Sequence, residues 1–457
     1  MKTCIKNLFL LPMVTASLGL LPPGRLTAQT FTNLHSFTGG DGATPYATLT
    51  VSGNTLYGTT KDGGLGSGTV FRINTDGTGF TNLHSFDANN DGASPYAGLV
   101  LSGNTLYGTA PYGGSDGKGT IFKVNTDGTG FVVIHPFLYP DHGEPYDGLI
   151  LSGDTLYGTT GEGGSFGWGS VFAVKTNGTG FTNLYSFNLN GSDGFYPYAG
   201  GGLLLLSNTM YGATLVGGIS NAGTVFRLNT DGSGYTNLYS FLYGNDGANP
   251  NSGLVLFGNA LYGTVGFGGS TDQGDVFKVN TDGSGFTNLH SFTGGFNEAY
   301  SDAGLFLSGS TLYGTTYLGG LGNKGTIFKI NTDGSGFTNL HHFAGTPDGA
   351  NLNGGLVLSG NTLYGTASAG GSSNSGTVFS YTLPGLAAPP PLTIRGSGAS
   401  VVLTWPTNPA GFGLQFATNL APPTFWTNAT HSPALVNGQN AVTNPVSGTM
   451  RFYRLKQ

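Results

Sequence analysis

The chain has 457 residues, of which only 8% are charged while 12% are aromatic and 83 are glycine, and its formal net charge is −6. Few charges beside many aromatic side chains exclude a disordered chain, and a single cysteine excludes a disulfide-rich scaffold. A mildly acidic chain without basic clusters is not expected to bind nucleic acid or an anionic lipid surface.

Residues 1–28 have the pattern of a secretory signal peptide. Lys2 and Lys6 precede an apolar run over residues 8–21, and small residues suited to cleavage follow it. The run is too short to span a bilayer comfortably, so a retained anchor is the less favoured alternative. We predict a secreted or cell-surface protein that does not insert in a membrane after cleavage. Because Cys4 lies inside the signal, cysteine chemistry is excluded from the mature chain.

An internal repeat dominates residues 29–382. The motif Leu-Tyr-Gly-Thr, or a close variant, recurs at spacings of 50 to 54 residues, and its tyrosines are Tyr57, Tyr107, Tyr157, Tyr211, Tyr262, Tyr313 and Tyr364. A second motif, Gly-Thr-Val-Phe or a close variant, follows each one and ends at Phe71, Phe122, Phe172, Phe226, Phe277, Phe328 and Phe379. A period near 50 residues with several short strands per repeat is typical of a β-propeller.

One repeat predicts four antiparallel strands, which would form one blade. The strands are expected over residues 98–101, 105–109, 119–124 and 131–137. A Ser-Gly-Asn turn joins the first two strands, and an Asn-Thr-Asp-Gly turn joins the last two. The loops after the second and fourth strands are longer and differ between repeats. Because these loops share one end of a four-strand meander, we call that end the varied-loop face.

The two ends of the array predict ring closure. An orphan fourth strand at residues 31–37 precedes the first motif, and the seventh repeat has a third strand at 376–382 but no fourth. The N-terminal strand can therefore complete the last blade and leave no open edge. An open solenoid would need polar capping repeats, which the sequence lacks. We predict an all-β fold: a closed seven-bladed β-propeller of four antiparallel strands per blade, followed by a small β-sandwich-like domain.

The repeat resembles the GloVer tandem repeat of secreted bacterial "choice-of-anchor" proteins. Residues 69–93 and 99–114 match its pattern of Gly-x-Val-Phe, Asn-Thr-Asp-Gly, Asp-Gly-x-x-Pro and Leu-Tyr-Gly-Thr nearly throughout, and the resemblance covers residues 31–382. The fourth repeat departs by an insertion at 200–202, and the sixth lacks Asp-Gly and Pro. The resemblance implies a propeller of unknown function, attached to a variable C-terminal sorting or anchoring region. It implies no catalytic residues.

The remaining chain predicts a linker and a second domain. Residues 383–392 are rich in proline and are expected to form a semi-rigid linker. Residues 393–457, with strand-like segments at 401–405 and 414–417, predict a small immunoglobulin-like or fibronectin-like β-domain. Two roles stay open for it, a spacer or an element that contacts a sorting or anchoring partner.

One repeat position holds five histidines and two tyrosines: His35, His84, His135, Tyr185, Tyr239, His290 and His341. This position lies on the fourth, outermost strand, so its copies are too far apart to share a metal ion, and packing is favoured. The Asp-Gly loops contain Asp41, Asp91, Asp141, Asp193, Asp246 and Asp348. One carboxylate per loop is a poor calcium site and favours a turn. We predict no metal and no cofactor.

Catalysis has one weak candidate site. Glycoside hydrolysis needs two carboxyl groups, and Glu144 and Glu162 both belong to loops of the third repeat. Loop acids are usually only solvated, so an enzyme is the minor hypothesis.

Aromatic residues of the varied loops are the candidates for ligand binding: Tyr112, Tyr139, Phe166, Trp168, Tyr243, Phe267 and Tyr317. Aromatic platforms suit a glycan or a protein partner, although such residues can also merely cover the core. The leading hypothesis is a secreted, non-catalytic binding or scaffold propeller. The alternatives are a polysaccharide-active enzyme that uses Glu144 and Glu162, and a purely structural surface protein.

Overall fold

The computed structural model describes residues 29–138, 143–189, 193–197, 202–295, 298–301, 303–383, 392–397, 400–406, 413–417, 427–428, 433–436, 439–445 and 452–456. The expected signal peptide, most of the linker, Tyr139, Asp141 and Trp426 lie outside these residues. One compact unit spans Thr30–Leu383, and a second includes Pro384–Gln457. The described residues are all-β, and none of their elements is a helix that could cross a membrane.

The larger unit contains seven four-stranded antiparallel sheets, numbered here in chain order. Sheets one to three are β2 (Thr50–Ser52), β3 (Thr55–Thr60), β4 (Thr69–Asn74), β5 (Thr81–Ser85); β6 (Val100–Ser102), β7 (Thr105–Ala110), β8 (Thr120–Asn125), β9 (Val132–Pro136); and β10 (Ile150–Ser152), β11 (Thr155–Thr160), β12 (Ser170–Lys175), β13 (Thr182–Ser186). In each of these sheets the strands pair in the order in which they follow one another along the chain.

Sheets four to six repeat this order. Their strands are β15 (Leu204–Leu206), β16 (Thr209–Thr214), β18 (Thr224–Asn229), β19 (Thr236–Ser240); β20 (Val255–Phe257), β21 (Ala260–Val265), β22 (Asp275–Asn280), β23 (Thr287–Ser291); and β25 (Phe306–Ser308), β26 (Thr311–Thr316), β28 (Thr326–Asn331), β29 (Thr338–His342). Two loop ribbons add β14 (Gly194–Phe195) with β17 (Val216–Gly217), and β24 (Glu298–Ala299) with β27 (Leu318–Gly319).

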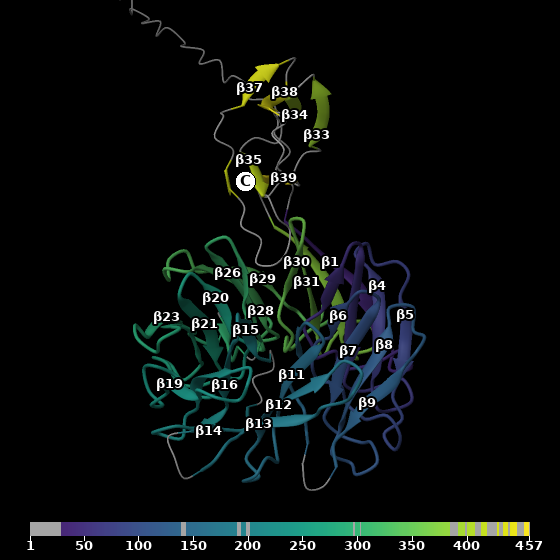
Figure 1. Cartoon of the computed structure of the whole chain (residues 1–457), viewed down its shortest axis with the longest axis vertical. Coiled ribbons are helices and arrows are strands. Elements are labelled where there is room, and N and C mark those ends of the chain that lie inside the picture. Colours follow the sequence, from purple (N-terminus) through teal and green to yellow (C-terminus); the bar gives the residue numbers. More distant parts are fainter. Residues whose placement is uncertain are drawn as a thin grey trace, which may run out of the picture. The chain divides into compact units, whose positions relative to one another are not determined.

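Sheet seven joins the two ends of the repeat array. Its strands are β30 (Val357–Ser359), β31 (Thr362–Ala367), β32 (Thr377–Thr382) and β1 (Thr30–Ser36). The N-terminal strand β1 pairs antiparallel with β32, from Thr30 opposite Thr382 to Ser36 opposite Thr377. In Figure 1 the strands of this unit follow one another around a common centre, from purple β1 through teal to green β30.

The Leu-Tyr-Gly-Thr motif lies on the second strand of each sheet, and its glycine makes room for an aromatic ring. A Cβ atom added to Gly108 would lie 2.5 Å from Cζ of Phe122, the phenylalanine of the second motif. The core lies between neighbouring sheets, as where Tyr57 of sheet one packs in one cluster with Leu106 and Phe122 of sheet two. Glycine and phenylalanine therefore recur together because each ring needs the missing side chain.

In six of the seven sheets the threonine of the motif ties the sheet to the next one, whereas sheet four has Ala213 at this position. Thr59 Oγ1 donates to the carbonyl of Ala97 at 3.0 Å, and Thr109 repeats this bond in sheet two. Thr366 of sheet seven donates in the same way to Ala47, which precedes sheet one, also at 3.0 Å. Sheet seven is thus bonded to sheet one as the other sheets are bonded to their neighbours.

The repeated histidines and tyrosines pack on the outermost strands. Each ring stacks on an aromatic ring of the adjoining repeat, with centroids 3.5 to 4.2 Å apart: His35 on Phe80, His84 on Phe131, His135 on Phe181, Tyr185 on Tyr235, Tyr239 on Phe286, His290 on Phe337 and His341 on Phe31. Each of the seven rings therefore contacts a different neighbouring repeat, and the rings do not meet at one site.

Carboxylates of the Asp-Gly loops hold five of these rings, those of His35, His84, Tyr185, Tyr239 and His341. His84 Nε2 lies 2.7 Å from Asp91, and Tyr239 donates to Asp246 at 2.9 Å. Sequence analysis assigned these aspartates to turns and did not foresee this partner. Loss of water lowers the pKa of His84 below its usual value, and the aspartate offsets only part of the effect.

The C-terminal unit has two small antiparallel sheets. Their strands, in pairing order, are β33 (Thr393–Ser397), β34 (Ser400–Pro406), β38 (Gln439–Pro445), β37 (Ala434–Val436), and β36 (Thr427–Asn428), β35 (Gly413–Ala417), β39 (Phe452–Lys456). Trp405 and Val442 of one sheet share a buried cluster with Leu414 and Leu455 of the other. The two sheets therefore pack face to face, as in a small sandwich.

Candidate binding surface at the central cavity

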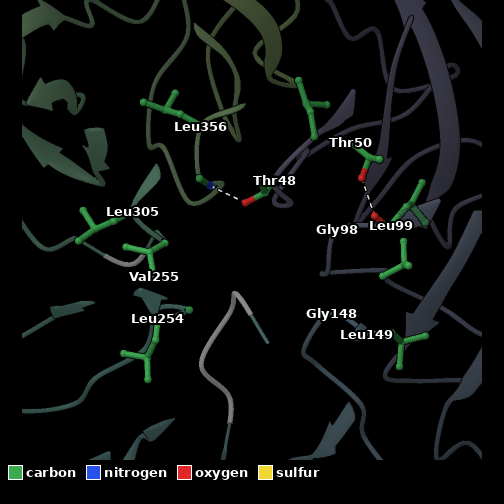
Figure 2. A pocket seen from close by; sticks show the side chains of 15 residues that line it. Thr48, Thr50, Gly98, Leu99, Gly148, Leu149, Leu254, Val255, Leu305 and Leu356 are labelled. Atoms are coloured by element: carbon green, nitrogen blue, oxygen red, sulfur yellow. Dashed lines mark hydrogen bonds between the residues drawn. The ribbon is translucent and has the colours of Figure 1, made fainter. Parts of the chain in front are cut away.

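A cavity of about 260 Å³ lies where the innermost strands meet (Figure 2). Six of the seven repeats line it, through residues 48–50, 98–100, 148–149, 253–255, 304–305 and 355–356. The lining side chains are threonine, leucine and valine, and none is charged. Figure 2 shows Thr48 Oγ1 accepting from the Gly355 N–H at 2.8 Å and Thr50 Oγ1 donating to the Leu99 carbonyl at 2.5 Å. The cavity lining therefore provides apolar surface and a few threonine hydroxyls, and none of its residues is titratable.

A strained residue precedes the cavity-lining segment in every repeat. The seven equivalent residues have φ between 52° and 61°: Thr44, Ser94, Glu144, Tyr196, Asn249, Tyr300 and Asn351. The Thr44 N–H donates to Ser375 of sheet seven at 2.9 Å, and its carbonyl accepts from the Lys61 N–H at 3.1 Å. Both backbone groups of this residue are therefore fixed by the flanking sheets. These two hydrogen bonds to neighbouring repeats explain how non-glycine residues are held in a conformation that they rarely adopt.

A row of tyrosines follows these strained residues. Tyr46 and Tyr96 lie edge to face with ring centroids 5.2 Å apart, and Tyr96 and Tyr146 do so at 5.5 Å. Tyr112 extends the row at 5.6 Å from Tyr146, and their hydroxyls are hydrogen-bonded. The Tyr146 hydroxyl also donates to Glu144 at 3.4 Å. Tyr46, Tyr96 and Tyr146 are half-buried, so each keeps part of its ring in contact with solvent.

Sequence analysis named Tyr112 but missed the other three members of the row. A signal was available, because the residue after the Pro position is Tyr in the first four repeats and Asn251, Asp302 and Asn353 in the last three. A repeat position that is aromatic in some repeats and polar in the others indicates that these two groups of repeats present different side chains at equivalent places. The fourth tyrosine, Tyr198, lies outside the described residues.

Charged groups flank the row. Lys61 Nζ lies 5.0 Å from the centre of the Tyr96 ring, and a hydrogen bond with Tyr96 is the main cause that raises the pKa of Lys61. Lys118 Nζ lies 3.4 Å from Glu144 Oε1 and 3.2 Å from Glu162 Oε2. Its bond to Glu162 is the main cause that raises the pKa of Lys118.

The structure brings together the two glutamates that sequence analysis considered as a catalytic pair. Glu144 and Glu162, however, engage the same ammonium group, that of Lys118. In glycoside hydrolysis the two carboxyl groups instead face a scissile bond between them. The arrangement is therefore an ion-pair cluster beside the tyrosine row.

Comparison with known protein families identifies the repeat. A family model described as the Gloeobacter/Verrucomicrobia repeat matches residues 24–204 and again residues 162–379. The chain belongs to the Gloeobacter/Verrucomicrobia repeat family. This match confirms the resemblance to the GloVer repeat. A search of curated proteins returns no relative of this Gloeobacter/Verrucomicrobia repeat protein.

Several solved structures are similar to the chain at low identity. A nidogen/laminin complex shares 15% identity over 63% of this chain and 94% of that chain, with a TM-score of 0.40. An oligogalacturonate lyase in complex with manganese shares 11% identity over 79% and 95%, with a TM-score of 0.48. A puromycin-hydrolyzing peptidase of Mycobacterium tuberculosis shares 12% identity over 83% and 61%, also at 0.48. We draw no activity from these likenesses.

The predicted loop aromatics of the Gloeobacter/Verrucomicrobia repeat protein fall into two groups. Those with exposed side chains are Tyr112 (37%), Phe166 (54%), Tyr243 (58%) and Phe267 (42%). Trp168 and Tyr317 are half-buried. Trp168 packs against the core cluster that contains Phe187, with its ring 5.4 Å from Phe195. The loop therefore folds back against the core, and the ring of Trp168 is partly covered by it.

A second hollow of about 540 Å³ lies between loops of repeats five and six. It is lined by Gln273, Gly295, Tyr300, Leu318, Gly320, Leu321, Gly322 and Asn323. Phe267 lies edge to face with Tyr300 at 5.4 Å. This hollow has one aromatic lining residue, whereas the row at repeats one to three has four neighbouring rings.

Proposed function

We propose that this protein is a secreted or cell-surface, non-catalytic binding module, and that its larger unit is one closed seven-bladed propeller. Its ligand, a glycan or another protein, contacts the varied-loop face. The C-terminal unit serves as the element that meets a sorting or anchoring partner. The sequence pattern of residues 1–28 supports export, and cleavage of this segment from the mature chain is the corresponding test.

The bonds between the first and last repeats support a single closed ring. The Thr44 N–H to Ser375 bond and the Thr366 to Ala47 bond both join repeat one to repeat seven. They are equivalent to the bonds between consecutive repeats elsewhere in the unit. Backbone pairing of β1 with β32 also supports closure, because the first and last strands of the repeat array share one sheet.

One observation carries the binding proposal: aromatic side chains with solvent-accessible rings gather in the varied loops. Tyr112, Phe166, Tyr243 and Phe267 are exposed there, and Tyr112 adjoins the half-buried row of Tyr46, Tyr96 and Tyr146. Contact of large aromatic rings with water is unfavourable and a partner that covers them removes this cost, so groups of exposed rings mark interaction surfaces. Glycine-rich short turns form the opposite end of the same sheets.

A glycan array with the mature chain tests the proposal. A purely structural surface protein, the third hypothesis, would bind no member of the array and would retain no soluble protein partner. A binding module gives saturable binding that is lost when aromatic residues of the varied-loop face are replaced. The C-terminal role is tested separately, since removal of residues 393–457 should release the protein from the cell surface without changing ligand affinity.

The enzyme alternative rests on the proximity of Glu144 and Glu162. Release of reducing sugar from soluble polysaccharides, measured for the wild-type chain and for Glu162→Gln, decides it. Turnover that disappears in Glu162→Gln would establish catalysis, because an amide cannot act as acid or nucleophile. An ion-pair role predicts no turnover in either protein and a small change of stability only.

A further inference from the structure

The tyrosine row lies at the end of the central cavity. Tyr46 precedes the lining residue Thr48 by two positions, and Thr50 follows by two more. Tyr46, Thr48 and Thr50 are each half-buried, whereas Ala47 and Leu49 between them are buried, so these three side chains share the side that keeps contact with solvent. Since the equivalent rings of repeats one to three are only 5.2 and 5.5 Å apart, they stand close to the centre of the unit. They border the cavity on the varied-loop face.

We propose that Tyr46, Tyr96 and Tyr146 form a subsite for a neutral oligosaccharide chain that crosses the entrance of the cavity. This inference rests on the proposed function, and it specifies the class of ligand and where on the varied-loop face the ligand binds. A chain laid along the row meets a ring face and then the edge and hydroxyl of the next ring. The ring separations are comparable to the length of one sugar residue in an extended chain.

The backbone beneath the row is fixed before a ligand arrives. The residues at the strained position, Ser94 and Glu144, donate their N–H groups to Ser67 at 2.8 Å and to Lys118 at 2.9 Å. Prolines Pro95 and Pro145 follow and are buried. A preorganised site loses little conformational entropy on binding, which is how a small contact area can give measurable affinity.

The charge around the row favours a neutral ligand. The amino groups of Lys61 and Lys118 are balanced by Asp62, Glu144 and Glu162, so the neighbourhood carries a small negative excess. An anionic polysaccharide would meet three carboxylates and two ammonium groups, of which Lys118 is already paired with Glu144 and Glu162. Hydroxyl groups of a neutral sugar can instead exchange hydrogen bonds with phenols, lysine and carboxylate, while its C–H face covers the rings.

The opposite side of the entrance is built differently. At the position of the tyrosines, repeat seven has Asn353, which is buried and accepts a hydrogen bond from Ser368 at 2.9 Å. Repeat seven therefore adds no ring to the row, which within the described residues spans repeats one to three. The ligand chain therefore lies to one side of the entrance and does not follow the pseudo-symmetry of the repeats.

The test uses hexamers of neutral β-linked glucan, mannan and xylan, with an alginate hexamer as the anionic comparison. Titration calorimetry with the mature chain measures the dissociation constants. We chose Tyr96→Asn as the variant because asparagine occupies this position in repeats five and seven. We expect at least one neutral hexamer to bind, Tyr96→Asn to weaken it about tenfold or more, and Tyr96→Phe to weaken it less. The melting temperature of both variants should stay near that of the wild type.

Phe257→Ser is the control, since Phe257 is an exposed aromatic residue at the short-turn end of β20, whereas Phe166→Ala replaces an exposed aromatic residue of the varied-loop face outside the row. Loss of binding in Phe166→Ala with unchanged binding in Tyr96→Asn and Tyr146→Asn would overturn the inference and leave the proposed function standing. Preference for the alginate hexamer would overturn the neutral class. If no hexamer binds, the inference fails together with the glycan part of the proposed function.

Discussion

Replacement of Asp275 by threonine should stabilise the protein. Asp275 begins β22 and is fully buried, and within the described part of the chain neither of its carboxylate oxygens has a hydrogen bond of good geometry. Ser291 and Asn288 approach the group, but burial dominates and raises its pKa above the usual value. The equivalent residues of the other repeats are small hydroxyl residues: Thr69, Thr120, Ser170, Thr224, Thr326 and Thr377.

Two of these repeats show what a threonine would do at this place. On the neighbouring strand, repeats two and seven have Ala110 and Ala367 opposite, as repeat five has Val265, without a hydroxyl partner. Thr120 there donates to the carbonyl of Asp91 at 2.8 Å. In Asp275→Thr the hydroxyl should donate to the Asp246 carbonyl. Because an unpaired buried polar group costs about 1–3 kcal/mol, we expect the free energy of unfolding to rise by about that amount.

The gain should depend on pH. Folding raises the pKa of Asp275. Over the pH range between the usual aspartate pKa and this raised pKa, the folded protein keeps the carboxyl proton and the unfolded chain has lost it. The wild-type contribution to stability therefore falls as pH rises through that window. Urea unfolding at pH 4 and pH 8 should show a larger gain for Asp275→Thr at pH 8. The reverse exchange, Thr377→Asp, should destabilise. A pH-independent gain, or no gain at all, would refute the reasoning.

Three further changes have defined outcomes. Deletion of residues 29–37 should expose the edge of β32, and a lower melting temperature with aggregation on heating would be seen by calorimetry and light scattering. Stability should fall as pH drops through about 6.5, because burial lowers the pKa of His84 in the folded state while the unfolded chain takes up a proton. His84→Tyr, which copies Tyr185, should reduce this slope, and an unchanged slope would contradict it. Trp168→Ala should cost about 1–3 kcal/mol in urea unfolding, since the ring is half-buried against the core; a wild-type midpoint would place the ring outside the core after all.

The repeated part of the fold could be predicted from the sequence because each strand carries its pattern seven times. Leu106, Tyr107 and Gly108 repeat as a set, since the glycine must face the ring of Phe122. The repeat of about 50 residues in the sequence therefore reflects a packing contact that recurs in every sheet. The orphan strand β1 was recognisable for the same reason, as a fourth strand without its repeat.

The candidate site was harder to predict because it depends on differences between repeats and on loops that meet in space. Tyr46, Tyr96 and Tyr146 occupy a position that sequence analysis did not single out. The bridge from Lys118 to Glu162 joins loops 44 residues apart and leaves no sequence spacing to recognise. Trp168 stands between glycines, and only the folded loop reveals its core contacts.

Hydrogen–deuterium exchange of the mature chain, with and without a saturating neutral hexasaccharide, tests the central claim most directly. Binding at the varied-loop face predicts added protection in segments 44–50, 94–100 and 144–150, with no change in the short turns at the opposite end of the sheets. Protection that appears in those short turns or in residues 393–457, while the three segments exchange as before, would contradict the account.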